Sequence, residues 1–151
     1  MSRERDPNAS GEPSSSAPRS MSFVRSSSGT RVLVVDPDVR FALLLKRFLE
    51  TRGWGVMWVS DGREALRDWE EIRPEVVVTE LDGEGLDGFE FVASVRRRNP
   101  ELPVVVCTRL AGVSQWSDED QHALGIAAVL LRPLQFMQLH STLNRVLSVS
   151  E

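Results

Sequence analysis

The chain has 151 residues and a formal net charge of −4, with 18 basic and 22 acidic residues. This length suits one domain plus a tail, and the negative balance disfavours nucleic-acid binding over the whole surface. The single cysteine, Cys107, excludes an internal disulfide and a paired-cysteine metal site. No apolar run approaches the ~20 residues of a membrane span, and no signal-peptide core is present, so we expect no membrane association and a cytoplasmic location.

Residues 1–30 differ in composition from the rest of the chain. They contain ten serines and three prolines and few apolar residues. Such a segment cannot bury enough surface to offset the entropy lost on ordering. We therefore predict a disordered tail over 1–30, within which Met21 is an alternative start, and one folded domain over 31–151.

From Arg31 onward, short apolar runs alternate with helical periodicities. The apolar runs predict strands at 31–36, 55–60, 76–80, 103–108 and 127–132. Helices are expected at 39–52, from Asp61 to Pro74, at 88–98, at 117–125 and at 134–148. In the first helix the apolar stripe is formed by Phe41, Leu44, Leu45, Phe48 and Leu49.

Five strand–helix repeats predict an α/β domain with a parallel sheet covered by helices on both faces. The length fits a flavodoxin-like (βα)5 doubly wound sheet with strand order 2-1-3-4-5. In such a sheet the binding crevice lies at the carboxyl ends of the strands, where strands 1 and 3 meet.

Four polar residues end the expected strands and should converge on that rim: Asp36, Glu80, Thr108 and Arg132. Paired carboxylates are suited to a hard divalent cation, and a hydroxyl facing a cation is suited to a phosphate-like anion. A static ion-pair cluster without any ligand explains the same composition, and the residues alone leave both alternatives open.

The sequence also resembles a known family. The stretches VLVVDPD, GREAL, VVVTELDGEGLDGFEF, PVVVCT and LLRP, spread over 31–148, resemble the receiver domain of bacterial response regulators. The resemblance implies a histidine kinase that phosphorylates an aspartate after the third strand, and an acidic pair that helps to bind Mg²⁺. It further implies that a Thr or Ser and a Lys, the latter before a cis-proline, contact the phosphoryl group.

Carried over by position, the catalytic set is incomplete. Asp36, Thr108 and Pro133 match the family pattern. Glu80 stands where the phosphoacceptor aspartate is expected, Pro37 replaces the second acid, and Arg132 replaces the lysine. Arg109 follows Thr108 where a small residue is usual, as a further anion contact or an obstacle, and Val129 replaces the aromatic switch residue of the fifth strand.

These departures have physical consequences. Glutamate is one methylene longer than aspartate, and a displacement of about 1 Å can cost ~10²-fold in rate. Arginine is a planar fork that suits a bidentate pair with a carboxylate. We therefore predict a fixed Glu80–Arg132 ion pair. Glu80 either mimics the phosphorylated state, which a hydrogen bond from the retained Thr108 hydroxyl would favour, or is an inert replacement, and the sequence leaves both alternatives open.

The leading hypothesis is a stand-alone pseudo-receiver, not an enzyme, that acts by protein contact independently of aspartyl phosphorylation. An alternative is a working phosphoacceptor in a phosphorelay, with Asp82 or Glu80 as acceptor and weak Mg²⁺ binding by Asp36, Glu80 and Asp82. A third reading is a pocket for a different anion held by Arg109 and Arg132.

Because no further domain follows the last helix, we expect output by contact. The family resemblance favours the face of the fourth helix, fifth strand and fifth helix for protein partners, and homodimer formation stays open. Candidate contact residues are Trp116, Val129 and Trp58; for both tryptophans, packing against the domain itself is the alternative. Trp54 and Trp69 fall on core-facing positions.

Overall fold

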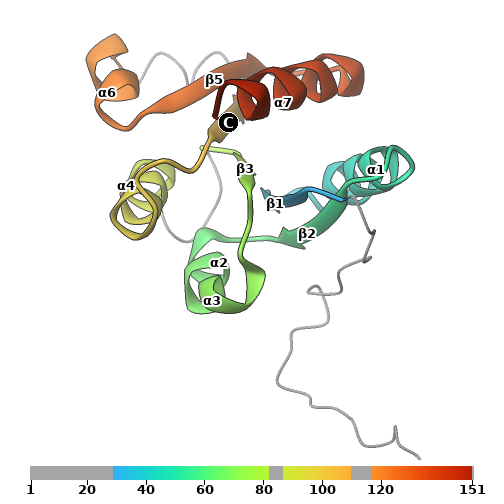
Figure 1. Ribbon diagram of the computed structural model, residues 1–151, viewed down its shortest axis with the longest axis horizontal. Coiled ribbons are helices and arrows are strands. Elements are labelled where there is room, and N and C mark those ends of the chain that lie inside the picture. The colour runs from blue at the N-terminus through green and yellow to red at the C-terminus, as the bar shows by residue number, and fades with distance from the viewer. Residues whose placement is uncertain (1–28, 82–86, 110–116, 151) are drawn as a thin grey trace, which may run out of the picture.

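The computed structural model describes residues 29–81, 87–109 and 117–150 (Figure 1). Nearly all of the expected disordered tail lies outside the described residues, as do Asp82 and Trp116. The domain boundary near Arg31 therefore stays a prediction. No helix in the described part is long and apolar enough to cross a membrane.

Five strands form one parallel sheet, and its order is β2-β1-β3-β4-β5, as predicted. Each strand is a short run of mainly apolar residues, and nearly every residue of the first four is buried because helices cover both faces. The strands are β1 (Arg31–Val35), β2 (Gly55–Val59), β3 (Val76–Thr79), β4 (Val104–Thr108) and β5 (Ile126–Leu131).

The helices are α1 (Val39–Glu50), α2 (Gly62–Arg67), α3 (Trp69–Ile72), α4 (Gly88–Arg98), α6 (Asp118–Ala123) and α7 (Phe136–Ser150). Side-chain caps start four of them, at Asp38, Asp61, Asp87 and Ser117. The helix expected between Asp61 and Pro74 is divided at Asp68 into α2 and α3.

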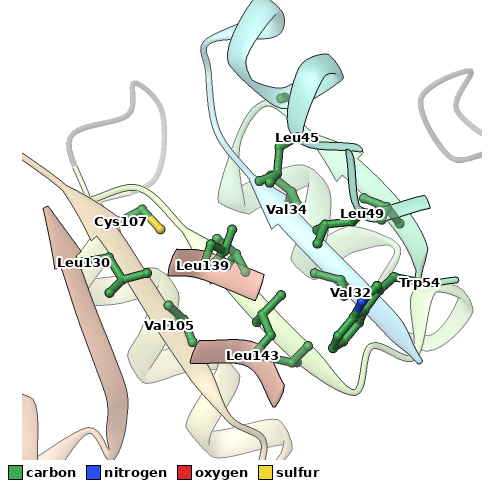
Figure 2. Close-up of a cluster of buried hydrophobic side chains, with 14 of the residues drawn as sticks. Val32, Val34, Leu45, Leu49, Trp54, Val105, Cys107, Leu130, Leu139 and Leu143 are labelled. Atoms are coloured by element: carbon green, nitrogen blue, oxygen red, sulfur yellow. The ribbon is translucent and has the colours of Figure 1, made fainter. Parts of the chain in front are cut away.

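Two apolar layers flank the sheet. Helices α1 and α7 cover one face, and α2, α3 and α4 cover the other (Figure 1). Figure 2 shows the first layer, in which Leu45, Leu49, Leu139 and Leu143 meet strand residues such as Val32. Trp54 and Trp69 are both 7% exposed, which confirms their expected core positions.

Cys107 also belongs to the layer under α1 and α7 (Figure 2). Its side chain is a free thiol, 1% exposed. Burial disfavours the charged thiolate and raises the pKa of Cys107 to about 12. This thiol therefore behaves as a packed apolar group rather than a nucleophile.

The structure corrects the expected stripe of α1 at one residue. Leu45 and Leu49 are fully buried, and Phe41 and Phe48 are half-buried, but Leu44 is 59% exposed. The ring of Phe136 on α7 lies between Phe41 and Phe48, with ring centroids 5.8 and 5.3 Å away. Leu44 projects about 100° away from Leu45 around the helix, beyond these rings, and so faces solvent.

Candidate functional site

The sheet brings the predicted rim residues together at its carboxyl edge. Val35 at the end of β1 pairs with Thr79 at the end of β3, so Asp36 and Glu80 follow at adjacent positions. Backbone hydrogen bonds continue past the strands: the Glu80 N–H donates to Val35 at 3.1 Å, and the Arg132 N–H donates to Thr108 at 2.9 Å. The sheet itself therefore positions both carboxylates and the arginine.

Arg132 bridges the two carboxylates. Its Nε lies 2.7 Å from Glu80 Oε1, and a terminal nitrogen of the same guanidinium donates to Asp36 Oδ2. The Nε–H is not aligned for a hydrogen bond, so the contact with Glu80 is an ion pair without a well-directed hydrogen bond. The predicted Glu80–Arg132 ion pair is present, and Asp36 joins it.

The remaining carboxylate oxygens also have polar partners. Glu80 Oε2 accepts from the Leu81 N–H at 2.9 Å, and Asp36 Oδ1 accepts from the Asp38 N–H at 2.8 Å. The Asp36 and Glu80 side chains are 4% and 9% exposed. Both carboxylates are thus nearly buried, and each is held at both of its oxygens.

Burial dominates the electrostatics of Asp36. Desolvation raises the pKa of its carboxyl above the ordinary value of 3.8, and the negative charge of Glu80 raises it further. The Asp38 N–H and the Arg132 guanidinium act in the opposite direction without offsetting the desolvation. The cluster therefore includes one carboxylate whose ionisation is disfavoured by its surroundings.

Sequence reasoning missed an aromatic member of the site. The guanidinium carbon of Arg132 lies 4.1 Å from the ring centroid of Phe41, a cation–π geometry. Phe41 stands in the first turn of α1, directly after β1, so its side chain starts from the same rim. That position was the available signal, although the helical spacing of Phe41 indicates only a core residue.

Trp58 supports the site from the edge strand β2. Its indole N–H donates to the Asp36 carbonyl at 2.9 Å, and its half-buried ring packs against the core under α1 and α7. The structure thus agrees with the packing alternative for Trp58, not with an exposed contact residue.

The hydrogen bond that Thr108 could have donated to Glu80 is not formed. Thr108 is fully buried, and within the described residues its hydroxyl has no hydrogen-bond partner. Glu80 turns its two oxygens toward Arg132 and the Leu81 N–H instead. Arg109 is exposed beside the rim, and Val129 is half-buried against the core under α4.

Comparison with known proteins agrees with this geometry. The family model of the response regulator receiver domain matches residues 32–144. The chain belongs to the response regulator receiver domain family. The fold comparison agrees: CheY4 of Vibrio cholerae superposes with a TM-score of 0.70 at 27% identity, covering 79% of this chain and 99% of that one. The receiver domain of HemR from Leptospira biflexa gives 0.71 at 25% identity, covering 79% of this chain and 94% of that one.

Two similar sequences belong to longer proteins. PrrA of Mycobacterium leprae is 35% identical over 99 residues, which cover 61% of this chain and 42% of PrrA. ZraR of Escherichia coli is 27% identical over 117 residues, which cover 78% of this chain and 26% of ZraR. The chain therefore spans less than half the length of these transcriptional regulators.

The receiver family implies a Mg²⁺ site at this rim, and the described residues do not fit it. Pro37 supplies no side-chain oxygen where the second acid is expected. The guanidinium of Arg132 occupies the position between Asp36 and Glu80 where a cation would neutralise both. Among the described residues no group of three metal-ligating side chains is assembled.

Proposed function

We propose that this receiver domain is a signalling module that acts by protein contact and not by aspartyl phosphorylation. The observation that carries the proposal is the bridge from Arg132 to both Asp36 and Glu80. In a phosphorylatable site a free carboxylate oxygen attacks the donor while a divalent cation neutralises the charge. In this chain the positive charge is supplied by the Arg132 side chain.

The chemistry of acyl-phosphate formation supports this reading. An attacking carboxylate oxygen must reach phosphorus in line with the leaving group, at a separation of about 3–3.5 Å. Glu80 Oε1 faces the Arg132 guanidinium, and Oε2 accepts the Leu81 N–H at 2.9 Å. Neither oxygen is presented to an incoming donor, and each would have to leave a charged or backbone partner.

The same bridge gives the rim a fixed charge pattern. Two buried carboxylates without a counter-ion would repel each other, and the guanidinium stacked on Phe41 prevents this. We infer that the internal cation holds the rim in one arrangement, so that the outer faces present a constant surface to partners.

The partners we propose are proteins of a bacterial signalling pathway in the cytoplasm. The face formed by α6, β5 and α7 is a candidate contact surface, because Leu131 and Met137 are 48% and 56% exposed there. The first turn of α6 adds Asp118, Glu119 and Asp120. This acidic surround disfavours nucleic acid as the partner.

Amide NMR of the full chain tests the proposal, with Mg²⁺ added first and beryllofluoride, a phosphoryl mimic, second. We expect no saturable shift at Glu80, Thr108 or Arg132. The positive control is the triple variant Pro37→Asp, Glu80→Asp, Arg132→Lys, which rebuilds the family's ligand set and should shift with both reagents. Saturable rim shifts in the wild type would overturn the proposal in favour of a working phosphoacceptor.

A further inference from the structure

An open groove lies at the amino edge of the sheet, opposite to the edge that carries the rim. Its volume is about 370 Å³, which falls within the usual size range of binding clefts. Thr30 lines the groove just before β1, Glu75 just before β3 and Pro103 just before β4, and Leu147 comes from the last turn of α7. The groove is therefore separate from the ion-pair cluster at the carboxyl edge.

The groove combines an apolar lining with acidic side chains at its mouth. Pro74 and Leu102 are buried members of the lining, and Leu147 is half-buried. Glu75 and Glu101 are exposed. A groove of this kind suits a short segment that carries apolar and basic side chains close together.

The two carboxylates of the groove differ in whether a neighbour already neutralises them. Glu75 Oε1 accepts from the Arg31 N–H at 2.8 Å, and the Arg31 guanidinium lies 3.7 Å from the same oxygen. Glu101, in contrast, forms no ion pair with any of the described residues. Glu101 is therefore the carboxylate of this groove that can take up a further cation.

The amino-terminal segment of the chain, residues 1–28, joins the domain at this groove. Thr30 lines the groove, and its carbonyl accepts from the Gly55 N–H at 2.9 Å, which fixes the backbone where the chain enters β1. The segment carries four arginines and three acidic residues, so its net charge is opposite to that of the groove. Charge and connectivity together make this segment a suitable occupant.

The apolar side chains of this segment are concentrated near the groove. Apart from Met1, its large apolar residues are Met21, Phe23 and Val24, and Phe23 is its one aromatic residue. Arg25 follows directly and is the arginine of the segment nearest to the domain. Residues 21–25 thus combine an aromatic anchor with a cation, as the groove requires.

The tether favours this occupant over a separate molecule. Five positions separate Arg25 from Thr30, and an extended chain of that length spans up to about 17 Å. A short flexible tether gives an effective concentration on the order of 1 mM, so a contact with a dissociation constant of about 1 mM is formed in roughly half of the molecules. A second copy would have to reach a similar concentration to compete.

We propose that residues 21–25 of this chain dock in the groove at the amino edge of its own sheet. Phe23 packs against the apolar lining around Leu102, and Arg25 pairs with Glu101. The serine- and proline-rich residues 1–20 are not part of the contact. The inference goes beyond the proposed function, because no residue of the rim takes part in it.

The first test is amide NMR relaxation of the full chain. Docking should give the backbone amides of residues 22–26 higher order parameters than those of residues 9–16. Phe23→Ser removes the aromatic anchor and should bring the two stretches to the same level. Equal order parameters for the two stretches in the wild type would refute the contact.

The second test exchanges the charges of the predicted ion pair and follows the methyl NMR signals of Leu102 and Leu147. Arg25→Glu and Glu101→Arg should each lower the ratio of docked to free segment about fivefold and shift these signals. The double variant Arg25→Glu, Glu101→Arg restores opposite charges and should recover the wild-type positions. Arg19→Glu makes the same charge change outside the docked residues and should have no effect. Failure of the double variant to recover the signals, or an equal effect of Arg19→Glu, would contradict the pairing.

The third test separates the chain's own segment from a second copy. A peptide of residues 19–28 is added to the full-length variant Phe23→Ser, Arg25→Glu, whose own segment should no longer dock. We expect saturable shifts of the Leu102 and Leu147 methyl signals with a dissociation constant on the order of 1 mM, and none with a peptide that carries Phe23→Ser. Wild-type methyl positions that change with protein concentration would assign the groove to a second copy and overturn the inference.

Discussion

The guanidinium of Arg96 on α4 donates from Nε to the carbonyl oxygen of Leu124, at the end of α6, at 2.6 Å. A terminal nitrogen donates to Gly125 at 3.0 Å, and another donates to Asn99, just beyond α4, at 3.1 Å. One side chain thus joins the carboxyl ends of two helices, where backbone carbonyls lack helical partners. Since α6 contributes no buried residue, we infer that these hydrogen bonds from Arg96 largely fix the position of α6.

We predict that Arg96→Met loosens α6 without unfolding the domain. The methionine keeps the aliphatic stem but leaves the carbonyls of Leu124 and Gly125 without their donor. Amide hydrogen exchange over α6 should accelerate about tenfold or more, while exchange in the strands changes little. Arg97→Met removes an exposed neighbouring arginine and is the control. Equal acceleration in the two variants would show that the hydrogen bonds from Arg96 do not fix the position of α6.

Replacing the bridging cation should destabilise the domain and create a metal site. Arg132→Met leaves Asp36 and Glu80 facing each other without a counter-ion, at an expected cost of about 2–4 kcal/mol in the free energy of unfolding. Mg²⁺ should then raise the melting temperature of the variant, because two carboxylates without an internal cation attract a divalent one. The wild-type melting temperature is the control and should not respond. A variant that ignores Mg²⁺ would contradict the view that Arg132 occupies the place of a metal ion.

The pH dependence of stability tests the environment of Asp36. Its pKa in the folded protein lies above the ordinary 3.8, mainly through desolvation, so the native state holds this proton more tightly than the unfolded chain does. As the pH rises from about 3.8 through the folded pKa, this residue's contribution to stability is lost, and it stays lost at higher pH. Below 3.8 its contribution is fully present.

Asp36→Asn should remove the pH-dependent contribution of residue 36 to stability while keeping an acceptor for the Asp38 N–H. In urea unfolding over a pH series, the wild type should lose stability relative to the variant as the pH rises through the window. Taking the difference between the two proteins cancels the titration of carboxylates that do not interact with Asp36. A difference that is constant with pH, or that changes in the opposite sense, would show that the pKa of Asp36 is not raised.

The Cys107 thiol offers a probe of global opening. Because burial raises its pKa to about 12, almost no thiolate forms near pH 8 in the native state. We expect iodoacetamide to react with Cys107 at least ~10³-fold more slowly than with the urea-unfolded chain. Mild urea should raise the rate in parallel with the population of unfolded protein. Rapid alkylation of the native protein would place the thiol in a locally open segment.

The order of the sheet could be derived from the sequence because it depends on local patterns and general packing rules. Apolar runs such as that of β1 alternate with helical stripes, and right-handed crossovers leave few arrangements for five parallel strands. The positions of Asp36 and Glu80 followed from the same rule, since residues after parallel strands share one edge. Even the Glu80–Arg132 pair was accessible, because Arg132 ends the fifth strand at the same edge of the sheet as the two carboxylates and carries the opposite charge.

Other contacts at the site, and the exposure of Leu44, depended on the conformations of single side chains. Asp36 and Arg132 are 96 residues apart in the chain, and their contact depends on how the guanidinium lies against Phe41. Thr108 ends β4 at the same edge, but its hydroxyl makes no bond to Glu80, whose two oxygens lie against Arg132 and the Leu81 N–H. Leu44 fits an apolar helical stripe by spacing, yet the Phe136 ring between Phe41 and Phe48 leaves it outside.

The sequence by itself therefore determined which backbone segments form the sheet, in what order, and which polar residues stand at its carboxyl edge. Periodicity, chain connectivity and charge are sufficient for that. Only the tertiary structure decided that Arg132 contacts both carboxylates, that Trp58 supports Asp36 through a hydrogen bond to its carbonyl, and that Leu44 on α1 faces solvent. These outcomes depend on competition between side chains for the same space and the same partners, and spacing along the chain does not encode that competition.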